Sequence, residues 1–251
     1  MLLVEHKFRA LQNFYQLSFA KPEEPIEPIF TSGSYADKVA FLTQFGRRKD
    51  GWHLLCEQVN HLRCAFKVMD DLIDEDVIRD HAPAYWVVNG EQATVNAAAW
   101  HLKQARQIAQ QLGVETLFER RLCEVIEGAT IEVELEAISQ DQLPDLQLTW
   151  YRIAQKESSF RLYLAEALDC PFEVCEATRQ DGIAAQMLDD GLSAIYGKDG
   201  RSAQDSSDIR LNRLTYMRAF GVSPEETVQR GKALKEKILK VLALTGGNHD
   251  R

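Results

Sequence analysis

The chain has 251 residues, 45% of them hydrophobic and 27% charged, so it can bury a full core and global disorder is excluded. Its 29 Lys and Arg stand against 38 Asp and Glu, a formal net charge of -9. That balance argues against a nucleic-acid or anionic-membrane binder, which would carry a basic stripe. A small phosphorylated ligand stays possible, because local charge decides its binding.

The termini and cysteines indicate a cytoplasmic protein. No segment reaches the roughly 18 apolar residues of a membrane helix, and residues 1–20 lack a signal-peptide cleavage site. The five cysteines are an odd number without CxxC spacing, which favours reduced thiols over disulfides or structural zinc.

Helical periodicity dominates the chain. Residues 1–20 predict an amphipathic helix, and residues 21–28 an extended linker rich in Pro and Glu. Apolar residues recur at helical spacing in five later spans: 50–76, 91–112, 114–140, 147–168 and 174–196. The chain shows no alternating strand pattern of useful length and no internal repeat. We therefore expect a single all-α domain over 1–251, a bundle of about ten helices.

The densest acidic run is DDLIDED at 70–76, at the end of a helical span. Asp70 and Asp74 are four residues apart, so their carboxylates share one helix face, with Asp71 beside them. Like charges at this spacing repel, and Mg²⁺ would remove the repulsion because it takes oxygen ligands and usually shares them with phosphate. The alternative is a solvated helix end without a ligand.

A second acidic pair, Asp189 and Asp190, ends another helical span. Two acidic helix ends can face each other across a bundle, which is how bundles build metal sites. A di-iron carboxylate site is the competing possibility, but it needs Glu-x-x-His on two helices. Glu57 and His61 come nearest and have the wrong spacing.

Six segments resemble, in order, motifs of the trans-isoprenyl diphosphate synthase family, between about residues 33 and 245. The family patterns are DDxxD, RRGxP, EGQxxD, Y..I...KT, FQxxDD and SDxxxGKxT. The matching segments are DDLID at Asp70, RDHAP at Arg79, EGATIE ending at Glu132, YRIAQKES with Lys156, AQMLDD with Gln186, and SDIRLNRLT with Asp208, Arg213 and Thr215. The resemblance implies a helical bundle around a central prenyl pocket and a homodimer.

The resemblance also implies a reaction and a site. An allylic prenyl diphosphate would be ionised with Mg²⁺ as cofactor. The implied Mg²⁺ ligands are Asp70, Asp71, Asp74 and Asp189. The implied catalytic residues are Asp70, Asp74, Asp189, Lys156 and Arg213, and the implied substrate-binding residues are Arg79, Lys156, Gln186, Arg213 and Phe66.

Two of these residues have plainer alternatives. Phe66 lies one turn before Asp70, where bulk would shorten the tail pocket and favour a substrate of ten to fifteen carbons; core packing explains it equally well. Gln186 would orient substrate or form a hydrogen bond between helices.

Departures from the family pattern fall on the side that binds isopentenyl diphosphate. The basic GGKRxRP segment looks here like SGSYADKVAF, and the second Arg of RRGxP is Asp80, which we expect to repel a homoallylic diphosphate. The third acid of the second aspartate motif is Ser193. A later loop lysine falls on Ala203, with Lys198 and Arg201 nearby as substitutes.

Three hypotheses follow. The first is an atypical prenyltransferase with a non-standard acceptor, similar to the moenomycin-type and pheromone-modifying enzymes. The second is a class IB terpene synthase acting on one prenyl diphosphate; Asp189 and Ser193 fit two steps of a cyclase triad and Gly197 fails the third. The third is a non-catalytic modulator of another prenyl synthase, which would not need the retained charged residues.

Overall fold

The computed structural model describes residues 4–20, 35–138, 142–143, 145–198 and 201–246, so the 21–28 linker lies outside the described residues. The described parts form an all-α fold with one two-stranded hairpin, β1 (Ile78–Arg79) and β2 (Ala82–Pro83). Its helices are α1 (Val4–Leu17), α2 (Tyr35–Leu42), α3 (Trp52–Ile73), α4 (Tyr85–Asn89), α5 (Glu91–Gln111), α6 (Glu115–Leu135), α7 (Leu146–Ile153), α8 (Gln155–Ala167), α9 (Phe172–Tyr196), the 3-10 helix η2 (Ala203–Asp205), α10 (Ser207–Arg210), α11 (Tyr216–Phe220) and α12 (Pro224–Gly246).

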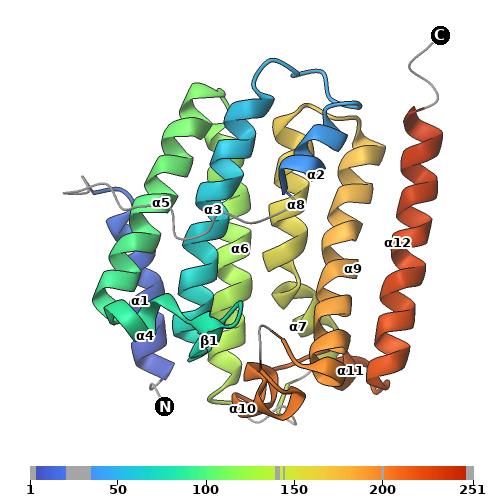
Figure 1. The fold of residues 1–251 in the computed structure, drawn as a ribbon. Coiled ribbons are helices and arrows are strands. Elements are labelled where there is room, and N and C mark those ends of the chain that lie inside the picture. The colour runs from blue at the N-terminus through green and yellow to red at the C-terminus, as the bar shows by residue number, and fades with distance from the viewer. Residues whose placement is uncertain (1–3, 21–34, 139–141, 144, 199–200, 247–251) are drawn as a thin grey trace.

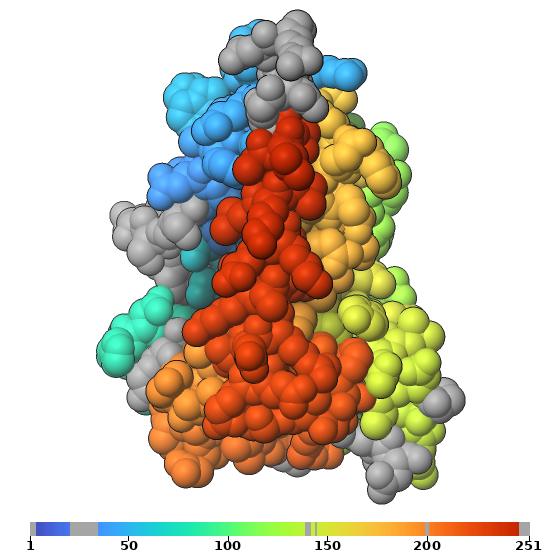
Figure 2. Space-filling model, turned by 90° about the vertical axis from the view of Figure 1, so that its right-hand side faces the viewer, coloured from blue at the N-terminus to red at the C-terminus, as the bar shows by residue number. Residues whose placement is uncertain are grey.

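The long helices run side by side as a bundle (Figure 1). Helix α3 packs on α5, α6 on α8, α8 on α9, and α9 on α12. Helix α12 runs along an outer face of the bundle (Figure 2). The short helices α10 and α11 lie at the end of the bundle where α3 and α9 finish (Figure 1). This arrangement confirms the predicted all-α bundle, and no helix of the described residues is long and apolar enough to cross a membrane.

Two apolar clusters hold the bundle together. The larger one joins buried side chains from α1, α3, α5, α6, α8 and α9, with Phe14, Leu72 and Phe118 almost fully buried. The smaller one surrounds Trp150 of α7, which is fully buried against Tyr216 of α11. The larger cluster positions α3 and α9 relative to each other, and the smaller one holds the end where their acidic residues lie.

The predicted helix over 147–168 is two helices, α7 and α8, which meet at Ala154. Glycines on α6 and α9 allow these two helices to lie close to the junction of α7 and α8. A Cβ on Gly128 of α6 would lie 3.0 Å from the carbonyl oxygen of Ile153, and one on Gly182 of α9 would lie 2.3 Å from the Cα of Ser158. Because no side chain intervenes, the start of α8 sits directly between α6 and α9, and Lys156 is held there.

Candidate functional site

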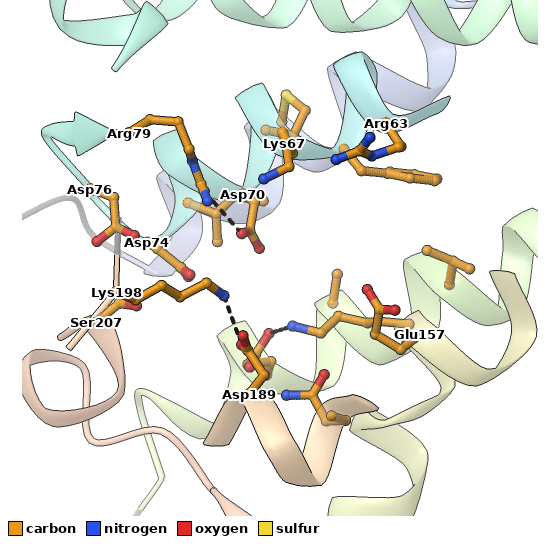
Figure 3. Close-up of a pocket in the computed structure, with 18 of the residues that line it drawn as sticks. Arg63, Lys67, Asp70, Asp74, Asp76, Arg79, Glu157, Asp189, Lys198 and Ser207 are labelled. Atoms are coloured by element: carbon orange, nitrogen blue, oxygen red, sulfur yellow. Dashed lines mark hydrogen bonds and ion pairs between the residues drawn. The ribbon is translucent and has the colours of Figure 1, made fainter. Parts of the chain in front are cut away.

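A cavity of about 290 Å³ lies between α3, α6, α8, α9 and the segment that follows α9 (Figure 3). Carboxylates from the ends of α3, α6 and α9 line one part of it. Aromatic and aliphatic side chains line the other part of the cavity. They come from α1, from α8, and from positions about one turn before the carboxylates in α3 and α6. A cavity that combines apolar walls with a few convergent polar groups is the usual form of a small-molecule site.

The end of α3 directs Asp70 and Asp74 into the cavity (Figure 3). Asp74 is the C-cap residue that follows α3, and its backbone N–H donates to the carbonyl oxygen of Asp70 at 2.7 Å. The side chain of Asp70 is 47% exposed. Burial opposes its ionisation, but Lys156 and Arg79 among the surrounding cations outweigh burial and hold the pKa of Asp70 below its usual range. Asp70 is thus an ionised carboxylate that opens to the cavity.

Asp74 is held from behind by Arg213. The guanidinium forms a close ion pair with Oδ1 of Asp74 and a second one with Oε1 of Glu136 at 3.0 Å. Burial raises the pKa of Asp74 to about 7, against the opposing charge of Arg213. Arg213 is 2% exposed and does not line the cavity. Its side chain is therefore placed to position Asp74.

Asp71 points away from the cavity into a buried ion pair. Nε of Arg79 donates to Oδ1 of Asp71 at 2.8 Å, and the Asp71 side chain has no exposed surface. Burial raises the pKa of Asp71 to about 6, although Arg79 opposes the shift. The structure does not bring Asp71 together with Asp70 and Asp74 on the lining. Arg79 does line the cavity, with Nη2 3.5 Å from Oδ2 of Asp70.

On the opposite wall, α9 carries two neighbouring acids with different surroundings. Asp189 is 48% exposed, faces the cavity, and accepts a hydrogen bond from Nζ of Lys198 at 2.7 Å (Figure 3). Asp190 is buried and accepts hydrogen bonds from the Trp150 indole at 3.0 Å and the Tyr216 backbone N–H at 2.6 Å. Burial raises the pKa of Asp190 to about 6. Asp189 belongs to the cavity and Asp190 to the packing of α7, α9 and α11.

Gln186 lies where it could orient a substrate, but it does not form the predicted hydrogen bond between helices. It lines the cavity, and its Nε2 donates to Oδ1 of Asp190 at 2.7 Å. The hydrogen bond is made within α9, so it does not join two helices. It fixes the amide group next to Asp189.

Lys156 and Glu132 form a close ion pair on the cavity wall between α8 and α6. Burial opposes the charge of Lys156, but Glu132, Asp70 and Asp74 outweigh it and raise its pKa. Lys156 is therefore a permanent cation at the acidic part of the cavity.

The segment after α9 closes the acidic part of the cavity with both cations and an acid. Arg201 lines the cavity and forms a close ion pair with the buried Asp76, which also accepts from Arg210 at 2.8 Å. Lys198 and Arg201, the two predicted substitutes for the loop lysine, both line the cavity. Asp208 does too, and burial together with nearby carboxylates raises its pKa to about 8. The SDxxxGKxT match had singled out Asp208 without a role.

Aromatic rings border the apolar part. Phe66 packs edge-to-face between Phe14 and Phe160, with ring centroids 6.4 Å apart in both pairs. Tyr35 packs on Phe160 at 5.2 Å. Phe66 and Phe160 also line a second, small cavity on the side of Phe118, so their rings separate the two spaces. Phe66 is both a core residue and a cavity wall.

Asp80 lies at the exposed turn between β1 and β2, with a positive φ of 51°, and it does not line the cavity. Water screens its charge there, so this position does not provide the repulsion of a diphosphate that we expected from the sequence. Two cations do line the cavity on the α3 face before Asp70: Arg63 and Lys67.

The donor chemistry suits Mg²⁺, because Asp70, Asp74 and Asp189 present carboxylate oxygens from two sides of one cavity. In the part of the chain that the structure describes, no three acidic, His or Cys side chains converge closely enough to hold a metal by themselves. Mg²⁺ in phosphate-binding sites takes only one or two carboxylates and completes its shell with phosphate and water. The residues therefore fit a metal shared with a diphosphate.

No family model and no curated protein matches the chain. It is similar to solved structures. A geranyltranstransferase from Thermotoga maritima has a TM-score of 0.67 at 15% identity, over 95% of this chain and 94% of that one. An isoprenoid synthase family member from Thermotoga neapolitana has a TM-score of 0.67 at 16% identity, over 96% and 94%. The likeness shows that the chain has the isoprenoid synthase fold, as the sequence resemblance implied.

Proposed function

We propose that this protein is an atypical prenyltransferase: it ionises an allylic prenyl diphosphate with Mg²⁺ and transfers the prenyl cation to an acceptor other than isopentenyl diphosphate. The observation that carries the proposal is the placement of Asp70 and Asp74 opposite Asp189, in one cavity whose other part is apolar. A diphosphate with its metal fits the first part and a prenyl tail fits the second.

Diphosphate leaves carbon only when its negative charge is neutralised. Bound Mg²⁺ would supply Lewis-acid assistance, and Asp70, Asp74 and Asp189 would hold it. Lys156, Lys198 and Arg201 line the same part and would pair with the departing anion. Lys156 and Lys198 would then exchange their present carboxylate partners for phosphate oxygens. Arg213 would act through Asp74, and Arg79 through Asp70 and Asp71.

The apolar part would hold the tail and exclude water from the allylic cation. Aromatic faces of Phe66 and Phe160 would stabilise the cation by about 0.5–2 kcal/mol each. The same two rings end the cavity, so a tail of ten to fifteen carbons is proposed, with longer tails stopped at this wall. We expect Phe160→Ala, which joins the two cavities, to extend acceptance to a twenty-carbon substrate.

Arg63 and Lys67 favour transfer over cyclisation. Lys67 lies one turn and Arg63 two turns before Asp70 on the same face of α3, on the lining and away from Asp189 (Figure 3). Cyclisation of a single substrate has no use for cations beside its tail, whereas an acceptor with a carboxylate or phosphate group would pair with them. The geranyltranstransferase named among the similar structures is also a transferase by its name.

A class IB terpene synthase is the second candidate. Asp189 and Ser193 lie one turn apart on α9, and both line the cavity. They match the first two of the three metal-binding positions expected in a cyclase. Such an enzyme would release a hydrocarbon or a terpene alcohol from one substrate alone. A non-catalytic modulator of another prenyl synthase is the third candidate. For all three candidates we propose that the protein is a homodimer.

The test combines substrate, acceptor and metal. Purified protein with Mg²⁺ is incubated with dimethylallyl, geranyl, farnesyl and geranylgeranyl diphosphates, each alone, with isopentenyl diphosphate, and with a panel of phosphorylated and carboxylated alcohols. Pyrophosphate release and product masses are measured. We expect Mg²⁺-dependent release from the ten- and fifteen-carbon substrates and a prenylated anionic acceptor.

Other outcomes exclude the proposal in separate ways. Longer prenyl diphosphates would mean ordinary chain elongation, and a hydrocarbon without acceptor would favour the synthase. No turnover, with stimulation of a partner synthase, would favour the modulator. The double variant Arg63→Gln/Lys67→Gln should lower transfer at least tenfold and leave acceptor-independent pyrophosphate release within about threefold; equal loss of both would remove the acceptor role.

A further inference from the structure

A buried lysine on the N-terminal helix lies behind the acidic part of the cavity. Lys7 of α1 is 1% exposed although it is charged. Its Nζ lies 2.8 Å from Oε2 of Glu136 and 3.2 Å from Oε1 of Glu75. Burying an ammonium group is costly unless it is paired, so these two contacts account for its charge but not for why a lysine is there.

The contacts continue from Lys7 to a proposed metal ligand. The two carboxylate oxygens of Glu136 pair with different cations. Oε2 pairs with Nζ of Lys7, and Oε1 lies 3.0 Å from Nη2 of Arg213. Arg213 in turn forms its close ion pair with Asp74. Four side chains thus form one continuous row of alternating charge that runs from the interior to the cavity: Lys7 of α1, Glu136 just after α6, Arg213 after α10, and Asp74 at the end of α3.

We propose that Lys7 is a positioning residue that sets Arg213, and through it Asp74, for binding of the metal and diphosphate; this rests on the proposed function. Arg213 lies between two carboxylates that compete for it. Lys7 neutralises part of the negative charge of Glu136, so the attraction of Glu136 for Arg213 is weaker and Arg213 stays paired with Asp74. Without Lys7, Glu136 attracts Arg213 more strongly and draws its guanidinium away from Asp74.

This role differs from simple packing. A residue needed only to fill space between α1 and α6 could be replaced by methionine, which has a similar length and no charge. Charge balance instead predicts that loss of Lys7 is harmful while Glu136 keeps its charge, and harmless when both charges are removed together.

The experiment compares Lys7→Met, Glu136→Gln and the double variant in the full chain. Titration calorimetry with MgCl₂ and inorganic pyrophosphate measures binding without turnover. The values of kcat and KM are measured with whichever prenyl diphosphate the turnover assay identifies as substrate. We expect Lys7→Met to weaken binding of pyrophosphate with Mg²⁺ about tenfold, equivalent to about 1.4 kcal/mol. The double variant should return to within threefold of wild type.

His6→Gln is the matched control, because His6 is the neighbouring residue on α1 and pairs with Glu91 at an exposed position. It should bind like wild type. Wild-type-like binding by Lys7→Met overturns the positioning role alone. Absence of pyrophosphate binding in wild type overturns the proposed function and this inference with it. If Lys7→Met does not fold, the double variant decides: near-wild-type binding supports the role, and a tenfold loss overturns it.

Discussion

At the scale of single residues, neighbouring acids in this protein have opposite tasks. Asp189 is half-exposed and faces the cavity, while Asp190 is buried beneath α7 and α11. Asp70 opens to the cavity, while Asp71 is buried against Arg79. Adjacent residues on a helix point about 100° apart, so one acid of each pair faces the cavity and the other faces the packed interior.

Substitution of the two α9 acids should therefore separate stability from activity. Asp190→Ala leaves the Trp150 indole N–H and the Tyr216 backbone N–H buried without an acceptor. We expect the free energy of unfolding to fall by about 2–4 kcal/mol. Asp189→Ala should change it by less than about 0.5 kcal/mol, since its ion pair with Lys198 is exposed, and should abolish turnover. Urea unfolding and pyrophosphate release measure both; equal stability losses would contradict the assignment.

Asp208 predicts how the stability of the metal-free protein depends on pH. Its pKa is raised from 3.8 to about 8, so between these values the folded state binds a proton that the unfolded state has lost. The stability that this proton brings is complete below about pH 4 and is lost as the pH rises through 8. Asp74, with its pKa near 7, acts in the same direction.

Asp208→Asn removes this dependence at one position. We expect the variant to have a Tm about 2–4 °C above wild type at pH 8 without metal, and an unchanged Tm at pH 4. Thermal unfolding followed by circular dichroism in a chelating buffer measures the difference. The same Tm difference at both pH values would show that the carboxyl does not carry a raised pKa.

At the scale of helices, the junction of α7 and α8 positions Lys156 and depends on the absence of a side chain at residue 182. A Cβ there would lie 2.3 Å from the Cα of Ser158 and 2.7 Å from the carbonyl oxygen of Glu157, both of them main-chain atoms that cannot move aside cheaply. Gly182→Ala should therefore cost about 1–3 kcal/mol of stability and lower turnover by displacing Lys156.

Gly231→Ala on α12 is the control for that variant. Its added Cβ would lie 2.9 Å from Cγ of Leu188, which can rotate away, and alanine is the better helix former by about 1 kcal/mol. We expect its stability within about 1 kcal/mol of wild type and full activity. If both glycine variants behave alike in unfolding and turnover assays, the close approach at residue 182 is not what holds Lys156.

The helices themselves were predictable, because each has a local signal. Apolar residues at helical spacing predicted α3, α5, α6 and α9 within a few residues. The break between α7 and α8 at Ala154 could not be predicted from the sequence, since it depends on the close approach of Gly128 and Gly182 from other helices. Spacing also placed Asp70 and Asp74 on one face. It did not reveal that Arg213 lies behind Asp74, or that Asp80 is screened at a turn.

At the scale of the whole molecule, the net charge of -9 hides a balanced site. Three of its carboxylates each pair with a cation: Lys198 on Asp189, Lys156 on Glu132 and Arg213 on Asp74. A metal alone would have to displace these cations, and a diphosphate alone would meet the carboxylates. If they bound together, as proposed, the metal and the diphosphate would bring charges that satisfy both sets at once.

Stabilisation by ligands should therefore depend on both components. We expect MgCl₂ alone and inorganic pyrophosphate alone to shift the Tm by less than about 2 °C, and the two together, at about 100 times their apparent Kd, to raise it by about 5–10 °C. Asp70→Asn and Asp189→Asn should abolish the joint shift. Asp37→Asn, an exposed acid of α2 that does not line the cavity, should keep it. Differential scanning fluorimetry gives the four curves; a joint shift that survives both cavity variants would mean that the ligands bind elsewhere on the molecule.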